Sequence, residues 1–280
     1  MDVLALSRRA ALAGLAAPLL PARAQGALPI FDAHVHYSHD AVELVPPKQA
    51  AALLRAAGLK GVLVSSSDDR GTQLLRAEAP DLVVPELRPY RTRADTGTWT
   101  SLPEVARYVE ERLAQHRYVG LGEFHLYGDE ADLPVPKRLV AMAREHGLVL
   151  HAHSDIAAVD KLFKQWPEAR VLWAHSGFER PASVRDVLRR HPKLWCDLAY
   201  RSDQASGREV DAAWRAVFDE FPARFMVGTD TFTPERWYYL AEHARWSRAW
   251  LADLPPPLAE RIAWRNAEAL FASWKAGPAP

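Results

Sequence analysis

Residues 31–38 read "FDAHVHYS", and this stretch places His34 and His36 two positions apart at the end of an apolar run. In a β-strand, residues two apart point to the same side, so both imidazoles can face the same space. Taken alone, the two histidines can be interpreted in two ways. They can form hydrogen bonds beside a surface turn, or they can be part of a metal site on a strand. The rest of the chain decides between these two interpretations.

The composition is that of a globular protein with a sizeable core, because 49% of the 280 residues are hydrophobic and 25% are charged. The formal net charge is zero, so nothing indicates nucleic acid or an anionic membrane as a partner. Cys196 is the single cysteine. An intramolecular disulfide and a thiolate-rich metal site are therefore excluded.

The first 24 residues predict a cleaved export signal. Arg8 and Arg9 precede an apolar run over 10–20 that is too short for a permanent membrane anchor. The Ala-Arg-Ala triplet that ends at Ala24 has small residues where a signal peptidase cleaves. The paired arginines resemble a twin-arginine signal, and a general secretory signal is the alternative. Both predict a periplasmic protein whose mature chain covers 25–280.

Eight short apolar runs alternate with amphipathic stretches in the mature chain, without an internal linker. Strands separated by helices predict βαβ units and a parallel sheet. Eight such units in about 250 residues predict an α/β fold with a single (β/α)₈ TIM barrel. A doubly wound open sheet is disfavoured, because no Gly-x-Gly-x-x-Gly turn follows the first run. Pro85 lies inside the third run, which predicts an edge or end position there. The runs cover residues 28–36, 58–66, 81–87, 117–125, 147–153, 169–177, 193–200 and 224–231, and the clearest helical stretches cover 48–58, 101–117, 136–147 and 183–192.

Ionisable residues lie near the C-terminal ends of five of these runs, although buried parallel strands are normally apolar throughout. In a TIM barrel, that end of every strand opens into the active site. Histidines or carboxylates at five strand ends would cost free energy unless they were paired or bound to a metal. They are His34, His36, Glu123, His125, His151, His153, His175 and Asp230. Three further histidines end predicted helices and are interpreted as structural: His116, His146 and His191.

These residues, in this order, resemble the metal-ligand series of the amidohydrolase superfamily. The closest pattern is that of its amidohydrolase-related (amidohydrolase 2) branch, and "ERIAWRNAEALF" at 260–271 is similar to the final helix of its members. The resemblance implies a metal-dependent hydrolase in which Asp230 and His175 are catalytic. The implied metal ligands are His34, His36, Glu123, His153, His175 and Asp230.

The fifth run contains two histidines, so its ligand is ambiguous. "VLHAHSD" and "VLWAHSG" share the pattern Val-Leu-x-Ala-His-Ser, which aligns His153 with His175. His153 is therefore the preferred ligand, and His151 would lie one pleat deeper in the barrel.

Imidazole and carboxylate ligands suit zinc, with manganese or iron as alternatives. Many binuclear members of the superfamily have a carbamylated lysine on the fourth strand, where this chain has Glu123. A glutamate can bridge two cations, which favours two metal ions. The alternative is that Glu123 pairs with a nearby arginine and that one ion binds.

The ligand set predicts hydrolysis of a small-molecule ester, lactone, amide or phosphoester by metal-activated water, with Asp230 as proton acceptor. Loops at the same end of the barrel predict two kinds of substrate contact: Arg91 and Arg201 would hold a carboxylate, and Trp237 or Tyr238 would stack on a ring. Four other tryptophans lie at helix positions and are expected in the core: Trp214, Trp246, Trp250 and Trp264.

Two other functions remain open from the sequence. One is a mononuclear decarboxylase, a lyase on the same barrel, which metal count and CO₂ release would distinguish from a hydrolase. The other is a non-enzymatic metal-binding envelope protein, which Asp230 disfavours because a storage site gains little from a proton acceptor. A nuclease is disfavoured by the neutral charge and the absence of a basic stripe. A homo-oligomer is possible.

Overall fold

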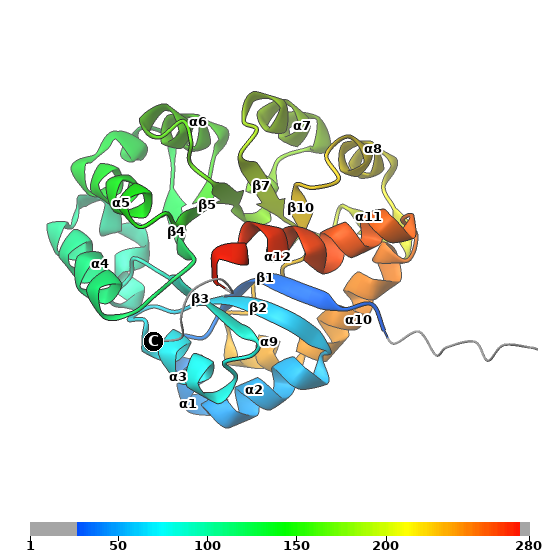
Figure 1. The fold of residues 1–280 in the computed structure, drawn as a ribbon. Coiled ribbons are helices and arrows are strands. Elements are labelled where there is room, and N and C mark those ends of the chain that lie inside the picture. The colour runs from blue at the N-terminus through cyan, green and yellow to red at the C-terminus, as the bar shows by residue number, and fades with distance from the viewer. Residues whose placement is uncertain (1–26, 275–280) are drawn as a thin grey trace, which may run out of the picture.

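The computed structural model describes residues 27–274, and the predicted export signal lies outside this part of the chain. Eight parallel strands form a nearly closed barrel with helices around it, which confirms the predicted TIM barrel (Figure 1). The barrel strands, in sheet order, are β1 (Ile30–His36), β2 (Leu59–Ser65), β3 (Val83–Leu87), β4 (Gly120–Leu126), β5 (Val149–Ser154), β6 (Val171–Trp173), β7 (Leu194–Asp197) and β10 (Phe225–Met226).

The helices lie outside the strands and bury one apolar face each. Many begin with proline in the first turn, where its missing N–H costs nothing. The three helix-ending histidines lie at the C-caps of α4, α5 and α7, as predicted. The helices are α1 (Asp40–Leu44), α2 (Pro47–Ala56), α3 (Arg70–Glu78), α4 (Pro103–Gln115), α5 (Pro134–Glu145), α6 (Ile156–Gln165), α7 (Pro181–Arg190), α8 (Ala212–Glu220), α9 (Pro234–Tyr238), α10 (Leu240–Leu251), α11 (Pro256–Glu260) and α12 (Asn266–Leu270).

The inside of the barrel is closed at one end by α12, which lies across the strands in Figure 1. Ala267, Leu270 and Phe271 pack against inward-facing apolar residues of the strands, and the Phe271 ring stacks on Phe31 at 5.9 Å. This apolar layer fills the N-terminal end of the barrel. Polar side chains are therefore left to the opposite end, where the strands finish.

Pro85 lies within β3, which has a strand on each side and is not at an edge of the sheet. The pairing of β3 with β2 ends at Pro85, opposite Val64, and the pairing of β3 with β4 begins at Glu86. The missing N–H of Pro85 thus falls where one ladder stops and the next starts, so no ladder hydrogen bond is lost.

The eighth strand is shorter than the apolar run 224–231 that predicts it, because regular pairing with β7 stops at Met226. Beyond this point the chain runs beside β1 and closes the barrel through separate main-chain hydrogen bonds. The side chain of Asp32 reinforces the closure by accepting hydrogen bonds from Thr229 N at 3.0 Å and Thr229 Oγ1 at 2.7 Å. The main-chain bonds are Ala33 N to Val227 O, Asp230 N to His34 O and His36 N to Thr231 O.

Gly122 lets β4 lie unusually close to β5. Its φ is +148°, and a Cβ atom there would lie 2.2 Å from the carbonyl oxygen of His151. We expect Gly122→Ala to destabilise the protein by about 1–3 kcal/mol through overpacking, a fall in Tm of roughly 3–10 °C for a chain of this size. Thermal unfolding followed by circular dichroism measures this fall in Tm.

Gly97→Ala is the matched control, because nothing lies within 4 Å of a Cβ at Gly97. Equal melting temperatures for the two variants would show that the contact between β4 and β5 relaxes without cost.

Candidate metal centre and active site

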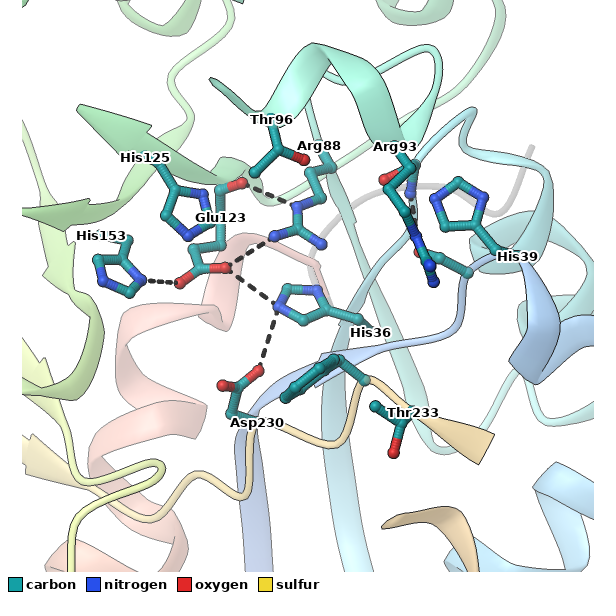
Figure 2. Close-up of a pocket in the computed structure, with 13 residues that line it drawn as sticks. His36, His39, Arg88, Arg93, Thr96, Glu123, His125, His153, Asp230 and Thr233 are labelled. Carbon is teal, nitrogen blue, oxygen red and sulfur yellow. Dashed lines mark hydrogen bonds and ion pairs between the residues drawn. The ribbon is translucent and has the colours of Figure 1, made fainter. Parts of the chain in front are cut away.

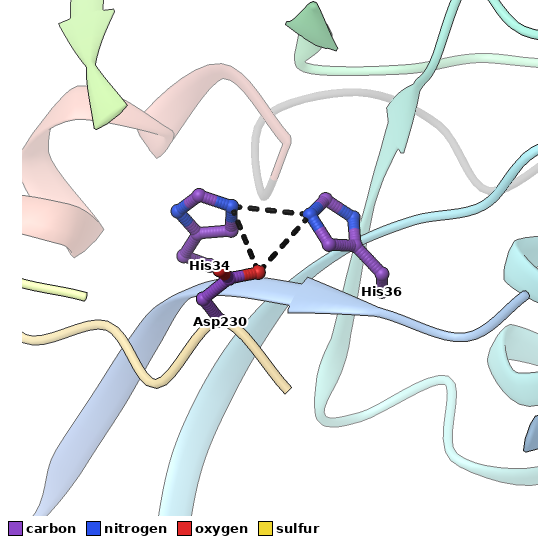
Figure 3. A group of neighbouring side chains, drawn as sticks. All are labelled: His34, His36 and Asp230. Carbon is purple, nitrogen blue, oxygen red and sulfur yellow. Dashed lines mark hydrogen bonds and ion pairs between the residues drawn. The ribbon is translucent and has the colours of Figure 1, made fainter. Parts of the chain in front are cut away.

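Three of the predicted ligands meet where β1 and the chain after β10 come together. His34 and His36 point to the same side of β1, with their Nε2 atoms 3.1 Å apart. Asp230 Oδ1 lies 3.6 Å from the first of these nitrogens and 3.5 Å from the second (Figure 3). Gly228 permits this approach, since a Cβ there would lie 3.0 Å from the Cβ of His34.

Glu123 extends the group toward β5 and β6. One carboxylate oxygen, Oε1, lies 2.9 Å from His153 Nδ1, 3.4 Å from His175 Nε2 and 3.6 Å from His34 Nε2. The other oxygen, Oε2, lies 3.2 Å from His36 Nε2. The structure thus gathers all six predicted ligands into one cluster around the buried Glu123 carboxylate.

The outer ring nitrogens of these histidines are already engaged. His175 Nδ1 lies 2.9 Å from the carbonyl oxygen of Ala199, and His34 Nδ1 lies 3.3 Å from the Asp197 carboxylate. Both partners can only accept, so each Nδ1 carries a proton and the Nε2 of the neutral ring is left with a lone pair. These lone pairs converge on the two carboxylates, and such a set of neutral imidazole and carboxylate donors fits a divalent cation.

The charges in the cluster support the same conclusion. Burial lowers the pKa of His36 well below its usual range, and the positive charge of Arg88 adds to this effect. His34 is equally buried, yet Asp197 and Glu123 hold its pKa well above the usual range. The carboxylates therefore favour positive charge beside them at His34, and a divalent cation could supply that charge in place of a proton.

A buried chain of charged side chains supports His34, and only its member His151 was expected near the site from the sequence. Asp197 at the end of β7 accepts hydrogen bonds through Oδ2 from His34 and from His151 Nε2, at 3.3 and 3.2 Å. His151 Nδ1 in turn lies 3.0 Å from Glu86 Oε2 on β3. Although burial opposes it, the charge of Glu86 and these hydrogen bonds raise the pKa of His151 to about 9. His151 is thus a charged supporting residue one pleat below His153, the depth predicted for it.

Asp197 also holds the main chain just after β6 and just after β7. Its Oδ1 accepts from the backbone N–H groups of His175 and Ala199, each at 2.9 Å. One carboxylate thereby fixes the ring of one predicted ligand and the backbone of another. An acidic residue inside the seventh apolar run was the sequence signal that could have identified it.

A cavity of about 410 Å³ opens above the cluster at the C-terminal ends of the strands (Figure 2). Arg88 enters its wall and binds Glu123 twice, through Nε to the carbonyl oxygen at 3.1 Å and through a terminal nitrogen to Oε2 at 3.0 Å. Glu123 therefore has the arginine partner that the single-ion alternative requires. The lining residues are His36, Ser38, His39, Ser67, Arg88, Arg93, Thr96, Glu123, His125, His153, Asp230, Phe232 and Thr233.

The three predicted substrate contacts do not line this cavity. Arg91 is engaged with Asp95 through two hydrogen bonds of 2.8 and 3.0 Å. Arg201 donates to the carbonyl oxygen of His175 at 2.9 Å, so it supports the loop that carries this ligand. Trp237 is fully buried against Tyr37. The structure corrects these assignments: Arg88, Arg93 and Phe232 are the arginines and the large apolar side chain that face the cavity.

The other tryptophans divide into two groups. Trp214 and Trp250 are buried in the core, as expected from their helix positions. Trp246 is 37% exposed and Trp264 is half-buried beneath Lys60, so neither lies fully in the core. Trp246 therefore lies on the exposed face of α10, whereas Trp264 packs partly against the core.

Comparison with known proteins agrees with this architecture. Residues 31–272 match the family Amidohydro_2, described as Amidohydrolase. The chain therefore belongs to the amidohydrolase family and is a hydrolase of that superfamily, which confirms the enzyme class predicted from the sequence. The family and the His, Glu and Asp clusters suit a divalent metal. No curated protein matches the chain.

Several solved structures share the fold at low sequence identity. An uncharacterized TIM-barrel protein from Bordetella bronchiseptica has a TM-score of 0.60 and 14% identity, covering 89% of this chain and 100% of that one. A mutant organophosphorus hydrolase from Deinococcus radiodurans has a TM-score of 0.57 and 16% identity, covering 88% and 93%. A putative 2-pyrone-4,6-dicarboxylic acid hydrolase from Pseudomonas putida has a TM-score of 0.56 and 17% identity, covering 88% and 98%.

Across residues 27–274, no helix has both the length and the apolar character needed to cross a membrane.

Proposed function

We propose that this protein hydrolyses a small-molecule ester, lactone, amide or phosphoester with a divalent cation, zinc being the candidate that suits the donors best. The observation that supports this most strongly is the convergence of the Nε2 atoms of His34, His36 and His175 on two carboxylates. A cation bound there would lower the pKa of a water molecule and polarise the bond to be cleaved.

The side chains of the cluster have different roles in this reaction. Asp230 lines the cavity and 14% of its side chain is exposed, so its carboxylate can accept a proton from water and pass it to the leaving group. His34, His36 and His175 are each 2% exposed or less and would hold the cation. Their engaged Nδ1 atoms fix the orientation of each ring before the substrate arrives.

Arg88 bears on the number of ions. Its charge lies 3.0 Å from Glu123 Oε2 and partly neutralises the carboxylate that would have to bridge two cations. We therefore expect metal analysis of the mature protein to give close to one ion per chain. Glu123→Gln should retain that ion, because His34, His36, His175 and Asp230 remain. Two ions in the wild type, with one lost in Glu123→Gln, would contradict the single-ion proposal.

The ion pair between Arg88 and Glu123 also favours a second candidate function, a decarboxylase with one cation. Arg93 also lines the cavity, so its wall offers positive charge to a carboxylated substrate. Release of CO₂ from aromatic or unsaturated carboxylic acids, without hydrolysis of neutral esters, would replace the hydrolase proposal with this one.

A substrate panel tests the proposed function. The zinc-loaded mature protein is assayed with aryl esters, aromatic lactones, amides and 4-nitrophenyl phosphotriesters, before and after removal of metal by a chelator. We expect hydrolysis of at least one class, its loss on chelation and its recovery when zinc is restored. Activity that survives complete removal of metal would exclude the proposed chemistry.

A further inference from the structure

His125 lies next to the cluster but has no role in the proposed function so far. It follows Glu123 by two residues on β4, so its side chain points into the barrel one pleat nearer the mouth. It pairs with His153 of β5, and the two rings stack with centroids 4.4 Å apart. Figure 2 shows His125 in the cavity wall above the Glu123 carboxylate. A substrate bound over the cluster would therefore contact this ring.

Two buried side chains hold His125 in place. The ladder between β3 and β4 covers only Glu86–Gly120 and Leu87–Leu121, so β3 offers no main-chain partner at His125. Tyr90 and Trp99 replace that partner. His125 N donates to Tyr90 Oη at 2.8 Å, and Trp99 Nε1 donates to His125 O at 2.7 Å. Both aromatic residues are at most 1% exposed, so His125 is rigidly positioned.

Tyr90 also decides which ring nitrogen of His125 carries the proton. Its hydroxyl oxygen lies 3.0 Å from His125 Nδ1 and already accepts from His125 N. The hydroxyl proton is buried and needs an acceptor. Among residues 27–274, His125 Nδ1 is the acceptor within hydrogen-bonding distance of this hydroxyl. Nδ1 therefore accepts, which leaves the proton of the neutral ring on Nε2.

We propose that His125 is a further catalytic residue, a neutral imidazole that donates a hydrogen bond from Nε2 to the substrate oxygen on which negative charge develops. This inference rests on the proposed function for the identity of that oxygen. Nε2 has no hydrogen-bond partner in the described part of the chain, so the donor is available to a ligand. A fixed donor of this kind contributes about 10²–10³-fold to kcat, because it stabilises the transition state more than the bound substrate.

The protonation of the ring can be measured without any substrate. In ¹⁵N-histidine-labelled, zinc-loaded protein, a two-bond ¹H–¹⁵N correlation spectrum distinguishes the two neutral tautomers, and His125→Gln assigns the signals. We expect a protonated Nε2 and an unprotonated Nδ1 at neutral pH, and loss of this preference in Tyr90→Phe. A protonated Nδ1 in the wild type would overturn the inference, whatever the enzyme hydrolyses.

Kinetics of the best substrate from the panel test the catalytic role. His125→Phe keeps the ring volume but has no donor, and its kcat should fall by about 10²–10³-fold with KM little changed. His125→Gln retains an N–H donor and should recover part of the loss. His146→Gln, on the exposed C-cap of α5, is the control that should leave the rate unchanged.

Three results separate the possible failures. Loss of a metal ion in His125→Phe would identify His125 as a ligand and overturn the inference. Unchanged kcat in His125→Phe on a metal-dependent substrate would also overturn it. Absence of hydrolysis by the wild type would refute the proposed function alone, since the tautomer measurement still decides the state of His125.

Discussion

Asp230→Asn is expected to lower kcat by about 10²–10⁴-fold on any substrate that the wild type hydrolyses, the usual contribution of a general base. Asparagine has nearly the same shape and still offers an oxygen to a cation, but it cannot accept a proton. The main chain at Asp230 is held independently of its side chain, by His34 O and by Arg236 Nε at 2.9 Å. Its φ of 49° also suits asparagine. The variant should therefore fold and retain much of its metal.

Steady-state kinetics, metal content and Tm of the variant are measured together. Asp219→Asn is the control, because Asp219 forms an exposed pair with Arg215 on α8, outside the barrel. If Asp230→Asn retained its metal and turned over at nearly the wild-type rate, Asp230 would have no part in proton transfer. The cluster would then be better explained as a binding site than as a hydrolytic centre.

Asp197→Asn is expected to weaken cation binding by about 10–100-fold, although Asp197 is not a proposed ligand. Its two oxygens accept from four N–H groups, belonging to His34, His151, His175 and Ala199. An amide has one oxygen, so its NH₂ group would face two of these donors and leave them without an acceptor. The positive charge of His151 would also lose one of its two carboxylate partners.

Competition with a chromophoric chelator gives the zinc affinity of the wild type and of Asp197→Asn. The free energy of unfolding should fall as well, by about 3–5 kcal/mol, because one partner of a buried charge pair is removed. Asp219→Asn again serves as the control and should change neither quantity. A wild-type zinc affinity in Asp197→Asn would show that His34 and His175 keep their orientation without this carboxylate.

The clustering of the six proposed ligands could be predicted because their positions follow from local rules. His34 and His36 are related by the period of a strand, and the C-terminal ends of parallel strands meet at the same end of a barrel. The same rules apply to Glu123, His153, His175 and Asp230, which all lie at or just beyond strand ends. The depth of His151 relative to His153 follows from the same alternation.

The loop residues that line the cavity could not be predicted, because they depend on how loops fold over one another. Arg88 and Arg91 are three residues apart in the same loop, but Arg88 reaches Glu123 and Arg91 pairs with Asp95. Nothing in the local sequence distinguishes them. Asp197 was missed for a related reason, since its importance comes from contacts with residues 22 to 163 positions away along the chain. Trp237 does not line the cavity because α9 turns its side chain into the core.

Metal analysis of the purified mature protein tests the central claim most directly. The wild type, loaded with zinc and then desalted, is compared with His34→Asn/His36→Asn and with the control His146→Gln. We predict close to one tightly bound ion per chain in the wild type and in the control, and loss of that ion in the double variant. A wild type without tightly bound metal, or a double variant that still binds its ion, would contradict the assignment of this cluster as the metal centre.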